Sequence, residues 1–202
     1  MTDTANETGQ KSVSIPPLLG FLLELEELKR IERQNPLSSG ERRETVAEHS
    51  WHLALATILL QDEVDVPFDT GYAVQLAVLH DVVEAFVGDT FAFGDTSGQH
   101  KREHDAMQEL RARTDLKSIH RLVDLWEQYE RQESVEARFV KGLDALLPIA
   151  QNYHNPEHSS WLRHGVSAEK VFARLNNHGE MGTLRAVGEE MITSAKEQGV
   201  LR

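Results

Sequence analysis

Three ionisable side chains, His80, Asp81 and Glu84, lie close together in an otherwise apolar segment, residues 76–85. On a helix, neighbouring side chains point about 100° apart, so His80 and Asp81 can hold one ion only where a helix end meets a cavity. Glu84 follows His80 by four residues and shares its face, where it is placed to act as a base. Buried acids without partners carry a desolvation penalty of several kcal/mol. A bound cation would supply the missing partner.

Asp144 is a fourth candidate, because it interrupts an apolar helical pattern at residues 140–147. Two interpretations of Asp144 are about equally supported by the sequence alone. It is either a metal ligand or the partner of Lys141, three residues earlier, in a salt bridge. A lone His-Asp dipeptide is also common by chance, so the apolar context carries the argument for His80 and Asp81.

The chain has no cysteine, which excludes disulfides, iron–sulfur clusters and thiolate zinc sites. Any metal must therefore take His, Asp or Glu ligands. Neutral imidazoles and carboxylates suit Mn, Co, Fe, Ni or Zn, and two His ligands make Mg less favoured. The sequence predicts one divalent ion in a nitrogen and oxygen site.

The elements that position these residues are predicted to be helices, because no segment shows the sustained alternation of a strand. A segment rich in Pro, Gly, Ser and Asn predicts a loop at 34–40, and a second loop is expected at 91–98. Apolar spacing and stop signals predict helices near 16–32, 46–60, 69–86, 100–113, 117–131, 134–152 with a kink at Pro148, 167–177 and 181–197. His80 and Asp81 would then lie towards the end of the third helix.

A chain of 202 residues fits one domain with a sizeable core. Residues 1–13 are polar and are expected to form a disordered tail. We found no internal repeat or low-complexity tract in the rest of the chain. The predicted fold is therefore all-α, a single compact helical bundle over residues 14–202.

Composition narrows the function further. A formal net charge of −12 argues against a protein that binds a nucleic-acid polymer, although local cations or a metal still allow a small phosphate ester as substrate. The N-terminal segment lacks the apolar centre of a signal peptide, and no apolar run approaches the ~18 residues of a membrane span. We therefore expect no membrane association and a cytoplasmic location.

Three ordered segments resemble the HD-domain superfamily of metal-dependent phosphohydrolases, and its 5′-deoxynucleotidase branch most closely. The likeness covers roughly residues 18–175, and three ordered motifs are much harder to obtain by chance than any one of them. The segments are residues 44–50 (ETVAEHS), residues 79–90 with Leu-His-Asp, Glu84 and Gly-Asp-Thr, and residues 136–144 (EARFVKGLD).

The resemblance implies an α-helical fold and a set of site residues. By this likeness Glu84 orients or deprotonates the attacking water, and Asp89 contacts the sugar hydroxyl of a nucleoside monophosphate. Thr90 caps a helix or approaches substrate, two interpretations that we rate equally. A homodimer is also favoured. The residues that match the family's metal ligands are His49, His80, Asp81 and Asp144.

Arg33 is the leading candidate for a phosphate contact, from a basic cluster that precedes His49. It occupies a place like that of a phosphate-contacting Arg in the resembling family. In the bacterial deoxynucleotidases a Trp follows that Arg, whereas Gln34 and Asn35 follow here. Base and sugar selectivity are therefore less firmly implied than the reaction.

Two other functions compete with a nucleoside 5′-monophosphate phosphatase. Hydrolysis of phosphodiesters or nucleoside triphosphates occurs elsewhere in the superfamily, but its large members carry extra segments that this chain lacks. A metal-binding regulatory protein without turnover is the third alternative. The remaining conspicuous residues are interpreted as structural: His52 beside Trp51, Trp126 and Tyr129 on a packed helix face, and the dispersed histidines near the surface.

Overall fold

The computed structural model describes residues 15–176 and 181–202, so the expected disordered tail at 1–13 lies outside the described residues. The helices are α1 (Pro17–Glu24), α2 (Val46–Leu60), α3 (Thr70–Leu79), α4 (Glu84–Val87), α5 (Gln99–Ala112), α6 (Lys117–Arg131), α7 (Val135–His154), α8 (Ser160–His164), α9 (Ala168–Asn176) and α10 (Leu184–Glu197). The 3₁₀ turns are η1 (Leu25–Lys29), η2 (Gln61–Glu63) and η3 (Pro156–His158), and the strands are β1 (Glu32–Pro36) and β2 (Arg43–Thr45). The predicted all-α class is confirmed, with one small hairpin added.

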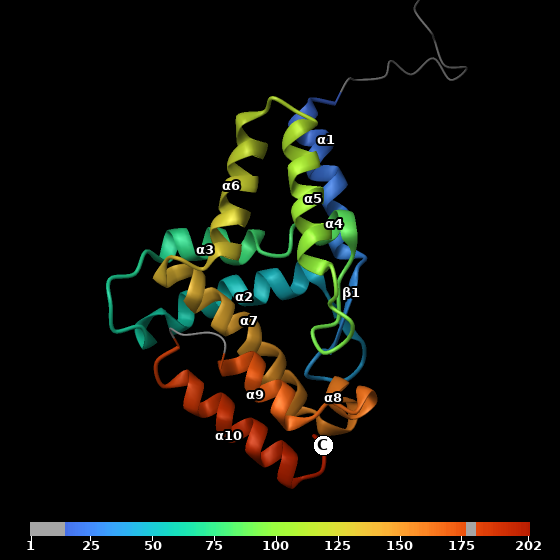
Figure 1. Cartoon of the computed structure of the whole chain (residues 1–202), viewed down its shortest axis with the longest axis vertical. Helices are drawn as coiled ribbons and strands as arrows, with labels where there is room; N and C mark the ends of the chain where they lie inside the picture. Colours follow the sequence, from blue (N-terminus) through green and yellow to red (C-terminus); the bar gives the residue numbers. More distant parts are fainter. Residues whose placement is uncertain (1–14, 177–180) are drawn as a thin grey trace, which may run out of the picture.

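The helices form two groups that meet at the middle of the molecule. Figure 1 shows α1, α5 and α6 extending together from one end, α7 crossing the centre, and α10 at the opposite end. Among the described residues, no helix is long and apolar enough to cross a membrane.

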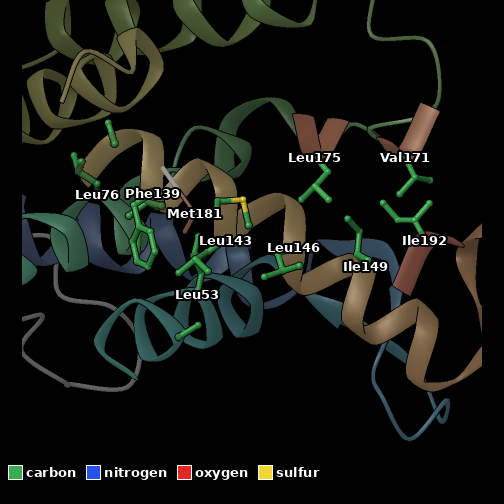
Figure 2. Close-up of a cluster of buried hydrophobic side chains, with 14 of the residues drawn as sticks. Leu53, Leu76, Phe139, Leu143, Leu146, Ile149, Val171, Leu175, Met181 and Ile192 are labelled. Carbon is green, nitrogen blue, oxygen red and sulfur yellow. The ribbon is translucent and has the colours of Figure 1, made fainter. Parts of the chain in front are cut away.

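Each group has its own hydrophobic cluster. The larger cluster joins α2, α3, α7, α9 and α10, and Figure 2 shows Leu143 and Leu146 of α7 between Leu53 of α2 and Leu175 of α9. The smaller cluster joins α1, α5 and α6 through Phe21, Met107, Val123 and others. Because α7 packs against both the N-terminal and the C-terminal helices, its inward residues lie at the centre of the fold.

The predicted helix over 16–32 is wrong beyond its first half, and part of the predicted loop at 34–40 is a strand. α1 ends at Glu24, η1 follows, and β1 then pairs antiparallel with β2, Glu32 opposite Thr45 and Pro36 opposite Arg43. Pro36 disfavours helical geometry at the residue before it, which is consistent with extended backbone there. The hairpin is short and polar, so it lacks the apolar alternation that identifies strands. It places Arg33 and Asn35 in the interior.

The predicted helix over 69–86 is interrupted at the chemically important residues. α3 ends at Leu79, and a turn follows in which the amide of Val82 donates to the Leu79 carbonyl (3.1 Å) and the amide of Glu84 to that of Asp81 (3.0 Å). Val82 and Val83 pack in the smaller cluster, whereas α3 packs in the larger one. The turn therefore carries the chain from one cluster to the other and leaves His80 and Asp81 at a helix end.

The start of α2 is fixed by its own sequence. Thr45 accepts a hydrogen bond from the amide of Glu48 (3.3 Å), and the Glu48 carboxylate accepts one from the amide of Thr45 (2.9 Å). This reciprocal pair is a capping box, which satisfies amides that the first helical turn leaves free. Because the cap fixes the residue at which α2 begins, it also fixes the position of His49 in the first turn of the helix, where its side chain is buried.

Candidate metal centre and active-site cavity

The four predicted ligands come from three elements and converge at one point. His49 lies near the start of α2, His80 and Asp81 in the turn after α3, and Asp144 on α7. Ligand atoms of His49, His80 and Asp81 lie within 4.8 Å of one another. Oδ1 of Asp144 lies 3.0 Å from Nε2 of His49 and 3.8 Å from Nε2 of His80. The fold therefore brings together residues up to 95 positions apart.

The chemistry of this donor set fits a cation. Nδ1 of His80 lies 2.9 Å from the carbonyl oxygen of Ala77, a bond that requires the proton on Nδ1 and leaves a lone pair on Nε2. That Nε2 is buried without a hydrogen-bond partner and faces Oδ2 of Asp81 at 2.9 Å. Two acceptor atoms at this distance need a positive species between them, which a divalent ion with nitrogen and oxygen ligands would provide.

The electrostatics prepare three of these groups to bind metal. Burial lowers the pKa of His49 to about 4, helped by the charge of Arg33, so the imidazole is neutral. Burial alone would raise the pKa values of Asp81 and Asp144, but the neighbouring histidines, Arg33 and Arg174 hold both below their ordinary range. For His80, burial lowers the pKa, yet the attraction of Asp81 and Asp144 outweighs it and the net shift is upward. A metal would compete with that proton.

Arg33 lies against the ligands and is buried. Its Nε donates to Oε1 of Glu44 (3.2 Å), its Nη1 donates to Oδ2 of Asp81 (2.9 Å), and its Nη2 lies 4.0 Å from Oδ1 of Asp144. Burial alone would lower the pKa of Arg33, but the negative charges of these three carboxylates outweigh burial. The net shift of the pKa is upward, so Arg33 stays charged. The predicted phosphate contact is therefore positioned at the metal site itself.

Glu84 is buried beside the ligands, and its Oε2 has no hydrogen-bond partner. Burial, together with the negative charges of Asp81 and Asp89, raises the pKa of Glu84 to about 10. In the metal-free protein this pKa keeps Glu84 protonated at neutral pH. A cation bound beside it would favour the ionised carboxylate, which is the form that a general base requires.

A cavity of about 350 Å³ opens over this centre. Asp81, Glu84 and Asp144 line it, and so do Asp89 and Thr90. Burial raises the pKa of Asp89 above its ordinary value, against the lowering effect of Arg33. Aromatic and cationic side chains complete the lining: Phe91, Phe93, Trp161, Arg33, Lys141 and Arg174.

Two contributors to the site, Glu44 and Arg174, did not emerge from the sequence. Glu44 accepts from Arg33 and from Nε2 of Gln151 (2.8 Å), and its Oε1 lies 3.6 Å from Nδ1 of His49. Arg174 of α9 donates to Oδ2 of Asp144 (3.4 Å). The signal for Glu44 was its place in the ETVAEHS motif, but Arg174 lies in an ordinary amphipathic helix, where nothing local distinguishes it.

The salt bridge considered for Asp144 does not form with Lys141. Nζ of Lys141 lies 3.8 Å from Oε1 of Glu130 and 4.6 Å from the ring centre of Tyr129. Asp144 instead has His49, Arg33 and Arg174 as close partners. Of the two interpretations, the structure therefore favours the metal ligand.

The residues interpreted as structural lie as expected. Trp126 and Tyr129 are almost fully buried, and the Tyr129 ring packs edge-on against His80 with 5.5 Å between ring centres. His52 stacks on Trp51 rather than joining the metal centre. Within the described residues, the group close enough to share an ion consists of His49, His80 and Asp81.

Comparison with known proteins identifies a family and several similar proteins. The HD-domain family profile matches residues 25–185. The chain is 33% identical over 146 residues to human 5′-deoxynucleotidase HDDC2, covering 70% of each chain. It is 31% identical to 5′-deoxynucleotidase hdd1 of Schizosaccharomyces pombe, covering 71% of this chain and 73% of that protein. The crystal structure of a predicted metal-dependent phosphohydrolase from Magnetospirillum magnetotacticum matches with a TM-score of 0.80 at 32% identity, over 91% of this chain and 96% of that one.

Proposed function

This chain belongs to the HD-domain family, and we propose that it is a metal-dependent phosphomonoesterase that hydrolyses nucleoside 5′-monophosphates, deoxyribonucleotides above all. The products are a nucleoside and inorganic phosphate. The observation that carries the proposal is a cluster of candidate metal ligands beside Glu84 and a cavity lined by cations: ligand atoms of His49, His80 and Asp81 lie within 4.8 Å of one another, and Asp144 lies within 4 Å of both histidines. The names of the relatives, several of them 5′-deoxynucleotidases, support the substrate class.

We propose that His49, His80, Asp81 and Asp144 hold one divalent ion. When bound, the ion polarises phosphoryl oxygens and lowers the pKa of water. The metal itself is not identified by the site, and the donor set favours Mn, Co, Fe, Ni or Zn over Mg.

We assign phosphate binding, proton transfer and substrate contact to side chains that surround the cavity. Arg33 is placed to bind a phosphate oxygen, because its guanidinium faces the cavity next to Asp81. Glu84 accepts the proton of the attacking water, because the charge of a bound ion would favour its ionised form over the protonated form of the metal-free protein. Asp89 and Thr90 line the same cavity, where we propose that Asp89 contacts the sugar hydroxyl and Thr90 approaches the substrate.

A phosphate-release assay tests the proposed activity. Purified protein loaded with Mn or Co should release phosphate from deoxynucleoside 5′-monophosphates, and chromatography should show the nucleoside as the other product. Release of pyrophosphate from triphosphates instead would assign the second activity considered for this fold. No turnover of any common deoxynucleoside monophosphate would contradict the proposal.

The Glu84→Ala variant tests the assignment of the base. We expect the variant to retain its metal, because the four ligands are unchanged, and to lose turnover by a factor on the order of 10²–10⁴. Metal content measured by mass spectrometry, together with kcat, checks both halves. A variant with near-normal kcat would remove Glu84 from the proposed role.

We further propose a cytoplasmic location, supported by the absence of cysteine in the sequence, and a homodimeric state, supported by the apolar side chains that α1 and α2 leave exposed. We propose no binding to a nucleic-acid polymer, in keeping with the net charge of −12.

A further inference from the structure

A groove between α7, α9 and the loop at 92–94 has a charge opposite to that of the whole protein. Its volume is about 460 Å³, and none of the described residues that line it is acidic. Three of the lining residues are cations: Lys141, Lys170 and Arg174. In a chain with 33 acidic and 21 basic residues, three cations without an acid make a local reversal of charge. We call the surface between these three residues the α9 groove.

Two of the three cations share one face of α9. Lys170 and Arg174 are four positions apart, so their Cβ atoms lie about 5–6 Å apart on the helix surface. Lys141 comes from α7, which packs beside α9 (Figure 1). Like charges at this spacing repel each other, and an anion placed between them would remove the repulsion. The arrangement therefore indicates an anion-binding surface.

Two of these cations have an acidic partner, but only at long range. Arg174 donates to Oδ2 of Asp144 over 3.4 Å, and Nζ of Lys141 lies 3.8 Å from Oε1 of Glu130. Charged hydrogen bonds are normally shorter, at about 2.7–2.9 Å. The side chains of Arg174 and Lys141 are only 28% and 23% exposed, so water screens their charges incompletely.

The third cation has no acidic partner. Within the described residues, Lys170 forms no ion pair. Its neighbour Glu169 is paired with Lys196 of α10 (3.0 Å), and Asp95, beyond the loop, accepts from the amide of Ser97 (2.9 Å). The nearest acids along the chain are therefore already engaged, and the charge of Lys170 is available to a ligand.

The α9 groove adjoins the cavity over the metal centre. Phe93, Lys141 and Arg174 line both of them. Arg33, to which we assign the substrate phosphate, lines the cavity and not the groove. It also has three carboxylates within 4.0 Å, which offset its charge when no metal is present. The two sets of cations are therefore separate anion sites.

The number of cations indicates the class of anion. A phosphate group carries nearly two negative charges at neutral pH and has three strong acceptor oxygens. It therefore matches three converging cations better than a carboxylate, which carries one charge and two oxygens. Ammonium and guanidinium groups are the usual donors to phosphate in proteins.

We propose that the α9 groove binds a phosphate group, separate from the one that Arg33 contacts. Two sources could supply it beside this cavity: inorganic phosphate released by the proposed reaction, or the second phosphate of a nucleoside bisphosphate. Because Arg174 also donates to Asp144, a phosphate in the groove competes for a guanidinium that contacts a candidate metal ligand. Occupancy of the groove should therefore change turnover as well.

Calorimetric titration with inorganic phosphate tests the site on the full-length, chelated protein, without any turnover. Sodium chloride at about 0.15 M screens attraction between distant exposed charges. We expect the wild type to bind one phosphate, and Lys170→Gln to bind it about 10–100-fold more weakly, because a charged hydrogen bond is lost. Lys117→Gln is the control: Lys117 is also an exposed lysine but lies at the start of α6, and this variant should bind phosphate as the wild type does.

Kinetics of the metal-loaded protein distinguishes the two sources, and this part rests on the proposed function. If free phosphate is the ligand, it should lower kcat as well as raise KM, and Lys170→Gln should lose the effect on kcat. If a bisphosphate is the ligand, a deoxynucleoside 3′,5′-bisphosphate should have a lower KM than the monophosphate, and Lys170→Gln should remove that difference. Without added phosphate, kcat for the monophosphate should be the same in both proteins.

Melting temperatures show that both variants are folded. Equal phosphate affinity in the wild type, Lys170→Gln and Lys117→Gln would overturn the proposed site, as would no heat of binding in the wild type at about 10 mM phosphate. A protein that binds phosphate through Lys170 but hydrolyses no monophosphate would contradict the proposed function and support the α9 groove. The two proposals can therefore fail separately.

Discussion

At the scale of single residues, the site contains two groups whose pKa values are shifted by burial in a direction that reduces the stability of the folded protein. Glu84 is an acid kept in its protonated form by burial, with a pKa of about 10, and His49 is a base kept neutral, with a pKa of about 4. Both shifts cost folding free energy at some pH, because the unfolded chain lets each group titrate normally. Such costs are common where a protein prepares a site for chemistry rather than for stability.

The first residue-scale prediction concerns the pH dependence of stability in metal-free protein. Between the unfolded pKa of Glu, about 4.3, and about 10, folded protein binds one proton more at Glu84 than unfolded protein does, so stability falls as pH rises. Glu84→Gln cannot titrate and should lose less stability between pH 6 and pH 9. We expect its melting temperature to exceed that of the wild type by several degrees at pH 9, at about 2–4 °C per kcal/mol.

Differential scanning calorimetry after chelation measures this difference. Glu197→Gln, at an exposed position on α10, should follow the wild type across the whole range. Parallel pH profiles for the wild type and Glu84→Gln would show that Glu84 ionises normally. Between about pH 4.3 and pH 6.5, unfolded protein binds more protons at His49, which opposes the contribution of Glu84 in the wild type. Glu84→Gln lacks that contribution, so it should lose more stability than the wild type as the pH falls through this range.

Glu44 gives the second residue-scale prediction. It is 2% exposed, it accepts from Arg33, and its Oε1 lies 3.6 Å from Nδ1 of His49. A carboxylate behind a ligating histidine orients the ring, and removal of such a partner weakens metal binding by about 10–100-fold. Glu44→Gln should therefore raise the metal Kd by that factor, measured by calorimetry, and raise KM because Arg33 loses its anchor.

Glu32→Gln is the matched control, because Glu32 lies on the same hairpin but is exposed and pairs with Arg43. It should leave both the metal Kd and KM unchanged. If Glu44→Gln only lowered the melting temperature while the folded protein bound metal normally, Glu44 would be structural and would not position His49.

Of the candidate metal ligands, His80 and Asp81 could be predicted from the apolar pattern that they interrupt, because an unpaired charge there needs a partner. The same pattern left Asp144 open between a metal ligand and a salt bridge, and His49 depended on the family resemblance. Glu44 and Arg174 could not be predicted. Their roles depend on contacts across 11 positions, from Arg33 to Glu44, and 30 positions, from Asp144 to Arg174. A local sequence pattern does not predict contacts between residues this far apart, so these two contacts can be identified only from the fold.

At the scale of elements, a buried polar network fixes the hairpin that carries Arg33. Asn152 of α7 donates to Oδ1 of Asn35 (3.2 Å) and accepts from the amide of Ser160 (2.7 Å) and from Oγ of Ser159 (2.8 Å). One side chain therefore joins β1, α7 and the start of α8. Buried networks of this kind are effective only when every member is satisfied.

Asn152→Leu should expose that dependence. The change keeps the approximate size but leaves the Ser160 amide and the Ser159 hydroxyl without an acceptor, at about 1–3 kcal/mol for each unsatisfied group, whereas the Ser160 hydroxyl retains Asn35. We expect the free energy of unfolding, measured in urea, to fall by about 3 kcal/mol, and KM to rise because β1 is held less firmly. Gln198→Leu, at an exposed position, should change stability by less than about 0.5 kcal/mol. An equal loss in both variants would contradict a role for the network.

Secondary structure could be predicted where a regular apolar pattern extends over many residues. The prediction failed where the element is short. α6 and α7 lie within two residues of the predicted ends, because each runs for 15 residues or more with one apolar face. β1 has five residues and β2 three, both polar, and their pairing is decided by contacts with α7 and α8 rather than by propensity. The turn at 80–83 was missed for a related reason: Val82 and Val83 continue the apolar pattern of α3 but pack in a different cluster.

At the scale of the whole molecule, the metal centre connects parts of the chain that otherwise contact one another through apolar packing. His49 comes from α2, Asp144 from α7, and His80 and Asp81 from the turn between the two hydrophobic clusters. An ion held by all four would bind the folded chain but not the unfolded one, in which these residues are far apart. Metal binding should therefore stabilise the entire fold and not only the cavity.

This stabilisation is measurable without any substrate. At a free metal concentration of about 100 times Kd, binding contributes about 2.7 kcal/mol, which raises the melting temperature of a chain of this size by about 5–10 °C. Asp144→Asn should lose most of that rise, because a neutral amide replaces a carboxylate that has His49 and His80 within 4 Å. Asp105→Asn, exposed on α5, should retain it in full. An equal rise of the melting temperature in both variants would mean that the ion binds elsewhere. A site built from α2, α7 and the turn after α3 should stabilise the fold less when one of its ligands is removed.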